Sequence, residues 1–241
     1  MNKVIQGDCL EVMKTIEDKS IDMILCDLPY GTTACKWDTI IPFEPLWEQY
    51  KRIIKDNGAI VLTASQPFTS ALVMSNIESF KYEWIWEKTR ATGFTHVKNS
   101  PMKKHESVLV YSKGNIKHKG QSNRMNYFPQ GLIEYGKEVD GTRSSETDTK
   151  GHHFGRPSNK TYVQEYTNYP NSILKFNSEG KTDHPTQKPV ALFEYLIKTY
   201  TNEGDIVLDN CAGSGTTGVA CKNTNRNYIL IEKEPEYIEI I

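Results

Sequence analysis

The fold of this 241-residue chain is decided by the stretch VLDNCAGSGTTG, residues 207–218. An apolar run that closes on Asp209 predicts a strand over 206–209, and the glycines after it predict a tight turn. Residues 216–222 then predict a helix, and 228–232 predict a further strand. A strand, a Gly-rich turn, a helix and a second strand are the repeating unit of a doubly wound α/β sheet.

The rest of the chain repeats this alternation outside one long segment. Strands are predicted over 3–6, 21–26, 59–63, 82–86 and 107–111, and helices over 10–16, 46–55 and 192–199, after Pro67 and from Pro235. Strands alternating with helices favour a mostly parallel sheet with helices on both faces. From 114 to about 170 the periodicity ends, and we interpret this stretch as an inserted recognition region.

Composition and charge narrow the function classes. The chain is 37% hydrophobic and 24% charged, as soluble globular proteins are, and it has no apolar run long enough for a membrane span. We expect neither a signal peptide nor a metal site, and five cysteines without a CxxC pair favour reduced thiols and a cytoplasmic location. Residues 81–160 hold 15 Lys and Arg against 8 Asp and Glu, which suits contact with a polyanion.

The Gly-rich turn permits two nucleoside cofactors. Residues 213–218 match GxGxxG. Glu232 follows this motif at close to the sequence separation at which dinucleotide-binding folds have a ribose-binding acid. This pattern alone would indicate an NAD enzyme. Asp209 counts against that reading, because a carboxylate before the turn repels a pyrophosphate and attracts a sulfonium or an ammonium group.

A second motif, Asp27-Leu28-Pro29-Tyr30, closes the apolar run 21–26. The exocyclic amine of adenine or cytosine is a weak nucleophile because its lone pair is delocalised into the ring. The Asp27 carboxylate and the Leu28 carbonyl are two acceptors that would grip its N–H bonds and aim the lone pair at a methyl donor. The Tyr30 ring offers a surface on which a flipped-out base would stack.

Together these motifs resemble the beta-class amino DNA methyltransferases, in which the catalytic motif precedes the cofactor motif. Asp27-Leu28-Pro29-Tyr30 is similar to the family's Asp-Pro-Pro-Tyr, and 208–217 resembles its Leu-Asp-Pro-Phe-x-Gly-Ser-Gly-Thr-Thr. The segment 184–189 resembles the stretch that packs over the methionine end of the cofactor, and Gly7-Asp8 resembles the first acidic strand end.

The resemblance implies a circularly permuted Rossmann-like methyltransferase fold dependent on S-adenosyl-L-methionine. Its seven-stranded, mostly parallel sheet would have the strand order 3-2-1-4-5-7-6, with the chain opening at the third strand. Residues 1–112 would form the catalytic half, 113–181 the inserted target-recognition region and 182–241 the cofactor-binding half.

The resemblance also implies site residues. The catalytic residues would be Asp27, Leu28, Pro29 and Tyr30. The cofactor would be bound by Asp8, Cys9, Asp27, Thr186, Gln187, Lys188, Asp209, Cys211, Ala212, Gly213, Ser214, Gly215, Thr217 and Glu232.

Basic side chains of the middle region, and two residues beside the catalytic turn, are candidates for DNA contact. They are Lys36, Trp37, Arg90, Lys98, Lys103, Lys104, Arg124, Arg143, Arg156 and Lys160. We expect 88–104 to be a basic loop that contacts phosphates.

Two departures from the family pattern bear on activity. Leu28 replaces a proline at a position that contributes a backbone carbonyl, and Asn210-Cys211 replaces Pro-Phe, which removes an aromatic ring. Asp27 favours adenine, because cytosine enzymes of this type more often have Ser there. Methylation of cytosine N4 is the alternative.

The leading hypothesis is therefore site-specific methylation of adenine N6 in double-stranded DNA. A catalytically decayed DNA-binding homologue, methylation of RNA or protein, and an NAD enzyme compete with it. A homodimer, a cognate restriction nuclease on another chain and a phage or prophage source are partners and origins that would suit such an enzyme.

Overall fold

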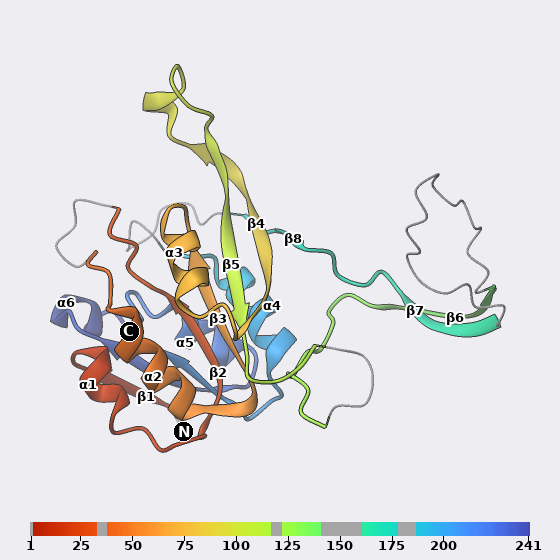
Figure 1. Ribbon diagram of the computed structural model, residues 1–241, viewed down its shortest axis with the longest axis horizontal. Helices are drawn as coiled ribbons and strands as arrows, with labels where there is room; N and C mark the ends of the chain where they lie inside the picture. Colours follow the sequence, from red (N-terminus) through yellow and green to blue (C-terminus); the bar gives the residue numbers. More distant parts are fainter. Residues whose placement is uncertain (1, 33–37, 117–121, 141–160, 178–186) are drawn as a thin grey trace. The chain divides into compact units, whose positions relative to one another are not determined.

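The computed structural model describes residues 2–32, 38–116, 122–140, 161–177 and 187–241 (Figure 1). It forms two compact units, one of 1–128 with 172–241 and one of 129–171. No helix among the described residues is long and apolar enough to cross a membrane.

The larger unit is built on an eight-stranded sheet. Its strands in chain order are β1 (Lys3–Gln6), β2 (Ile21–Asp27), β3 (Ile54–Ala64), β4 (Phe80–Thr92), β5 (Lys103–Tyr111), β8 (Ile173–Lys175), β9 (Ile206–Asp209) and β10 (Asn227–Glu232). Its helices are α1 (Cys9–Met13), α2 (Phe43–Ile53), α3 (Phe68–Ser75), α4 (Val190–Tyr200), α5 (Thr216–Asn223) and α6 (Pro235–Ile238), with a 3₁₀ turn over Phe94–His96.

The strand order is β1-β10-β9-β2-β3-β5-β4-β8. Its first seven strands reproduce the predicted order 3-2-1-4-5-7-6, with β1 as the third strand of that scheme. All neighbouring pairs are parallel except those made by β5, which runs against β3 and β4. The predicted sheet lacked one strand: β8 adds a short eighth one beside β4, at Ile85–Glu87.

Helices cover both faces of the sheet, and the alternation of side chains along β2 shows how. Ile24 and Cys26 belong to one core with residues of α1, α2 and α3. Met23 and Leu25 belong to a second core with residues of α4 and α5. Successive side chains of a strand point to opposite faces, so β2 is apolar from Met23 to Cys26 because it is buried on both.

Two segments differ from the expected organisation. The predicted basic loop 88–104 is largely a hairpin, because β4 continues to Thr92 and β5 begins at Lys103. Figure 1 shows this hairpin extending well beyond the end of β3. We call the part from 88 to 104 the hairpin arm.

The segment read as lacking regular structure, 114–170, contains an antiparallel pair. The strands are β6 (Ile133–Asp140) and β7 (Thr161–Thr167), which belong to the unit of 129–171. That unit is narrower than the insert of 113–181 that we expected, and β8 joins the main sheet. Exposed Tyr135, Tyr162 and Tyr166 on this ribbon have no apolar periodicity to signal them.

Candidate active site

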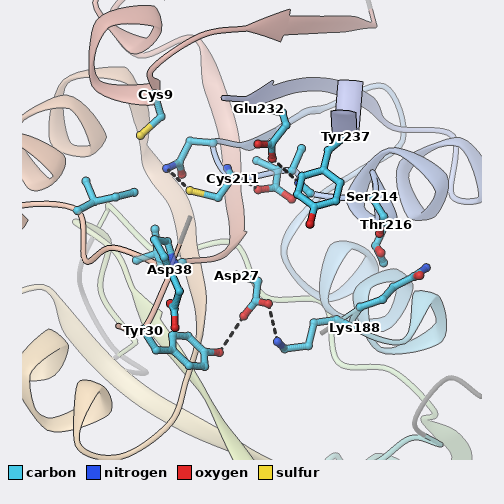
Figure 2. Close-up of a pocket in the computed structure, with 18 of the residues that line it drawn as sticks. Cys9, Asp27, Tyr30, Asp38, Lys188, Cys211, Ser214, Thr216, Glu232 and Tyr237 are labelled. Atoms are coloured by element: carbon cyan, nitrogen blue, oxygen red, sulfur yellow. Dashed lines mark hydrogen bonds and ion pairs between the residues drawn. The ribbon is translucent and has the colours of Figure 1, made fainter. Parts of the chain in front are cut away.

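Asp27 is the last residue of β2, and its carboxylate is surrounded by donors. Its Oδ1 accepts hydrogen bonds from the Tyr30 hydroxyl, at 2.8 Å, and from the Thr63 hydroxyl. Its Oδ2 accepts one from the Lys188 ammonium at 2.5 Å. Thr63 lies here because it is the register partner of Asp27 on the parallel strand β3. Figure 2 shows Asp27 between Tyr30 and Lys188.

Tyr30 supports this carboxylate as well as lining the cavity beside it. One face of its ring stacks on Phe68, with the centroids 5.2 Å apart. Burial, with the charges of Asp27 and Glu106, raises the pKa of the Tyr30 hydroxyl well above its ordinary value. The hydroxyl is therefore a permanent donor to Asp27, a role that the expected stacking of a base did not include.

The turn after Asp27 is fixed by two further contacts. The Leu28 side chain is buried in the core, and the Gly31 and Thr32 N–H groups donate to the Asp38 carboxylate at 2.8 and 2.9 Å. A buried anchor and a carboxylate clamp hold the backbone of this turn without the proline that Leu28 replaces.

Lys188 stands between two carboxylates. Its ammonium contacts Asp27 Oδ2 at 2.5 Å and Glu106 Oε2 at 3.6 Å, and the side chain is only 8% exposed. Glu106 Oε1 is in turn paired with the Lys88 ammonium. Burial lowers the pKa of Lys188 and the two carboxylates raise it, with a net rise, so the ammonium stays charged.

An acidic residue at the end of β10, Glu232, holds the Gly-rich turn. Glu232 accepts hydrogen bonds from the Gly213 N–H at 2.7 Å and the Glu234 N–H at 2.8 Å. Gly213 and Gly215 have φ angles of 52° and 79°, which favour glycine, and Gly215 precedes the first turn of α5. The glycines let the backbone fold under the carboxylate without side chains in the way.

Asp209, at the end of β9, is 3% exposed. It accepts hydrogen bonds from the Cys211 N–H, at 3.0 Å, and from the Thr217 hydroxyl. Burial is the largest influence on this carboxyl and raises its pKa to about 6, against the lowering effect of the donors. A buried carboxylate with a raised pKa gains from a cationic ligand.

We therefore expect Asp209→Asn to stabilise the cofactor-free protein at pH 7.5, by about 1–3 kcal/mol. Because the pKa of Asp209 is raised from 3.8 to about 6, the stabilising contribution of its protonated form is complete below about pH 4 and is lost as the pH rises through about 6. Asparagine keeps the acceptor for Cys211 and has no charge to bury. Urea unfolding of both proteins at pH 4 and 7.5 measures the difference, and a variant less stable than wild type at pH 7.5 would contradict it.

These groups line one cavity of about 720 Å³. The predicted residues that line it are Asp8, Cys9, Asp27, Leu28, Pro29, Tyr30, Arg90, Lys103, Gln187, Lys188, Asp209, Cys211, Ala212, Gly213, Ser214 and Glu232. The parallel strands β2, β9 and β10 end at the same edge of the sheet, which is where ligands bind in such folds. The catalytic and cofactor motifs, far apart in sequence, thus meet in one site.

Other predicted residues lie elsewhere. Thr217 is buried under the turn, where it supports Asp209, and Gly215 does not line the cavity. Lys98, Lys104 and Arg124 are also outside its lining, and Lys104 pairs with Glu87 at 2.9 Å. Outside the described residues are Lys36, Trp37, Arg143, Arg156, Lys160 and Thr186.

Sequence reasoning missed Glu106 and Lys88, which line the cavity beside Lys188. The predicted site residues were those at the carboxyl ends of parallel strands. Because β5 runs antiparallel, its beginning lies at that edge and brings Glu106 there. A charged residue directly before the apolar run 107–111 was the available signal, and it needed the direction of the strand to be interpreted.

The chemistry of the cavity fits S-adenosyl-L-methionine. Glu232 and Asp8 are acceptors at two strand ends, as hydroxyls and amines of a nucleoside need, and Asp209 is an anion near the Gly-rich turn. Asn210 replaces the family's proline, and its side chain accepts the Tyr50 hydroxyl at 2.5 Å, which ties the turn into the core. Half-exposed Cys211 takes the place of the family's aromatic residue and leaves room there.

Comparisons with known proteins agree with this geometry. Residues 21–241 match the family described as DNA methylase, of the N6/N4 methyltransferase type. The chain is 31% identical to type II methyltransferase M.HpaI of Haemophilus parainfluenzae over 99% of this chain and 72% of that protein. It is 28% identical to DNA adenine methyltransferase YhdJ of Escherichia coli (strain K12), over 98% of this chain and 80% of that one. The crystal structure of the M1.HpyAVI–SAM complex is similar at a TM-score of 0.62 and 27% identity, over 100% of this chain and 98% of that one.

Proposed function

This chain belongs to the N6/N4 DNA methylase family, and from that premise we propose that it methylates the exocyclic N6 of adenine at specific sites in duplex DNA. It is an S-adenosyl-L-methionine-dependent methyltransferase, and adenine is the proposed target base. Of all the observations, the presence of Asp27-Leu28-Pro29-Tyr30 in one cavity with Asp209 and Glu232 supports the proposal most directly.

The residues of the chain have distinct tasks in this reaction. S-adenosyl-L-methionine, when bound, supplies a methyl group on a sulfonium sulfur. Asp27 and the Leu28 carbonyl accept the two N–H bonds of the target amine, which localises its lone pair on nitrogen. Tyr30 and Thr63 hold the Asp27 carboxylate in position for this, and the proton released from the methylated amine passes to Asp27.

Adenine is proposed over cytosine on two grounds. The first residue of the catalytic motif is Asp27, where family enzymes for cytosine more often have Ser. A relative at 28% identity bears the name DNA adenine methyltransferase. The N4 of cytosine has the same amine chemistry and is the alternative target.

Sequencing that detects modified bases tests this proposal in a cell. DNA from a methylation-deficient host expressing the chain is expected to carry modified adenines at one short sequence, and DNA from a host expressing Asp27→Ala is expected to carry none. Modified cytosines at one sequence would support the alternative. Dimerisation, a restriction partner, a cytoplasmic location and a phage or prophage origin stay predictions.

We propose the hairpin arm as a surface that contacts the DNA backbone. Arg90 and Lys103 line the cavity, Lys98 is exposed farther along, and Phe94 at the tip is 75% exposed. Basic side chains around an exposed aromatic ring suit a nucleic acid, since the charges bind phosphates and the ring stacks on bases.

Lys98→Ala is therefore expected to weaken DNA binding several-fold, to the same degree for every sequence. It should also lower the slope of log affinity against log salt concentration by about one, as the loss of a single phosphate contact does. Binding titrations between 50 and 200 mM salt measure this slope. Lys14→Ala, at an exposed residue paired with Glu11, is the matched control and should change neither quantity. An unchanged slope for Lys98→Ala would exclude this contact.

A further inference from the structure

The carboxylate that must accept the target amine is already occupied in this structure. Asp27 Oδ1 accepts two hydroxyl hydrogen bonds, and Oδ2 accepts the Lys188 ammonium. A carboxylate oxygen has about two lone-pair positions, so Oδ2 can accept one more donor. That donor would share its oxygen with a full positive charge. The amine nitrogen itself becomes positive as it is methylated, so Lys188 in this position opposes the reaction.

Glu106 offers the ammonium a second position. Its Oε2 is buried and has no hydrogen-bond partner among the residues that the structure describes, although it lies 3.6 Å from the Lys188 nitrogen. Its Oε1 is held by Lys88, whose side chain is 15% exposed, so the carboxylate is fixed in place. An ammonium on a flexible four-carbon stem needs to move only about 1 Å to make an ordinary charged hydrogen bond with Oε2.

We propose that Lys188 is a mobile counter-ion with two positions, on Asp27 in the empty site and on Glu106 when the target amine is bound. Glu106 is then a positioning residue for methyl transfer, acting through Lys188. The inference deepens the proposed function, because it concerns how the same site accepts an exocyclic amine.

The charges around Lys188 explain why two positions exist. Asp27 of β2 and Glu106 of β5 are the anions, and Lys88 of β4 and Lys188 are the cations. Half-buried Lys103 of β5 lies near Glu106, and burial lowers its pKa. The neutral Tyr30 hydroxyl completes the surroundings. Glu106 keeps Lys88 in both positions, and when Lys188 shifts to Glu106 the incoming amine takes its place at Asp27.

A double-mutant cycle with Lys188→Met and Glu106→Gln tests the proposal. In Lys188→Met two partly buried carboxylates lack the ammonium between them, and contacts of 2.5 and 3.6 Å to that one atom put their oxygens within about 6 Å. Two like charges this close repel each other, so the pair holds a proton to a higher pH than a lone carboxylate does. We expect methyl transfer at pH 7 to fall at least about 100-fold and to recover as the pH rises, unlike that of the wild type.

Glu106→Gln is expected to lower the rate of the wild type, whereas adding it to Lys188→Met is expected to raise the rate of that variant. Glu106→Gln replaces the carboxylate of the second position with a neutral amide that attracts the Lys188 ammonium less, and the rate should fall about tenfold while S-adenosyl-L-methionine affinity is kept. The double variant removes one cation and one anion, so Asp27 is again a carboxylate. Its rate at pH 7 is expected to exceed that of Lys188→Met at least about tenfold. Lys14→Met, which removes an exposed Lys, should match wild type.

Additive losses, with the double variant slower than either single one and pH profiles parallel to wild type, would overturn the proposal. Unfolding free energy provides a second readout that needs no activity. Lys188→Met should lose stability from pH 5 to 8 relative to the double variant, because ionising a carboxyl with a raised pKa favours the unfolded state. A wild-type protein that methylates no DNA would refute the proposed function instead, and the unfolding comparison would still decide whether Lys188 separates the two carboxylates.

Discussion

Asp27→Ala is expected to lower the rate of methyl transfer at least about 10³-fold while S-adenosyl-L-methionine still binds. Alanine removes the acceptor that localises the lone pair of the amine and leaves the Gly-rich turn, Asp209 and Glu232 untouched. The loss should therefore fall on the chemical step and not on the cofactor.

Single-turnover transfer of labelled methyl groups, with a parallel cofactor titration, measures both quantities. Asp27→Asn is the matched variant, because its amide retains one oxygen acceptor without charge, and its rate should fall between the two. Transfer by Asp27→Ala within tenfold of wild type would contradict the assigned role. DNA binding by wild type and variant alike, with transfer by neither, would favour the decayed homologue.

The second large effect concerns the cofactor. Glu232→Gln is expected to weaken S-adenosyl-L-methionine binding about 10–100-fold, because charged hydrogen bonds from the ribose hydroxyls are replaced by one neutral acceptor. In wild type, Glu232 accepts hydrogen bonds from the N–H groups of Gly213 and Glu234. Gln keeps an oxygen that can accept one of these two hydrogen bonds.

Isothermal titration of the cofactor-free protein measures this change. Glu236→Gln, at an exposed residue of α6 outside the cavity lining, is the control and should bind like wild type. Equal affinity in wild type and Glu232→Gln would exclude the ribose role. S-adenosyl-L-methionine, and not NAD, should raise the unfolding temperature, which separates the two meanings of GxGxxG.

Much of the fold follows from the sequence because apolar periodicity and turn residues act locally. The run 21–26 is apolar except for Asp22, which is typical of a strand buried on both faces, and the structure places it between two cores. The order of the first seven strands came from the resemblance and was confirmed. The eighth strand, only three residues long, has no pattern of its own.

The site residues that belong to contiguous sequence motifs could be predicted. Asp27, Asp209 and Glu232 each end a strand, and parallel strands bring such ends together. The partners of Asp27 were not predictable in this way. The position of Thr63 depends on the register of β3, and that of Glu106 on the direction of β5. Neither the register nor the direction can be predicted from the local sequence.

The hairpin arm was predicted to be a loop and is largely a paired hairpin. Its basic charges suggested a loop, but pairing between β4 and β5 continues to Thr92 and Lys103. Cross-strand hydrogen bonds and ion pairs such as Lys104 with Glu87 hold a polar hairpin that hydrophobic alternation does not reveal.

The most direct test of the central claim is to incubate the purified protein with methyl-labelled S-adenosyl-L-methionine and unmethylated bacterial DNA. The DNA is then digested to nucleosides, and the labelled product is identified by mass. We predict label on N6-methyladenine, and none when Asp27→Ala is used. Label on N4-methylcytosine would keep the mechanism and reverse the target base. Bound cofactor with no label in any nucleoside would contradict the claim that this site methylates DNA.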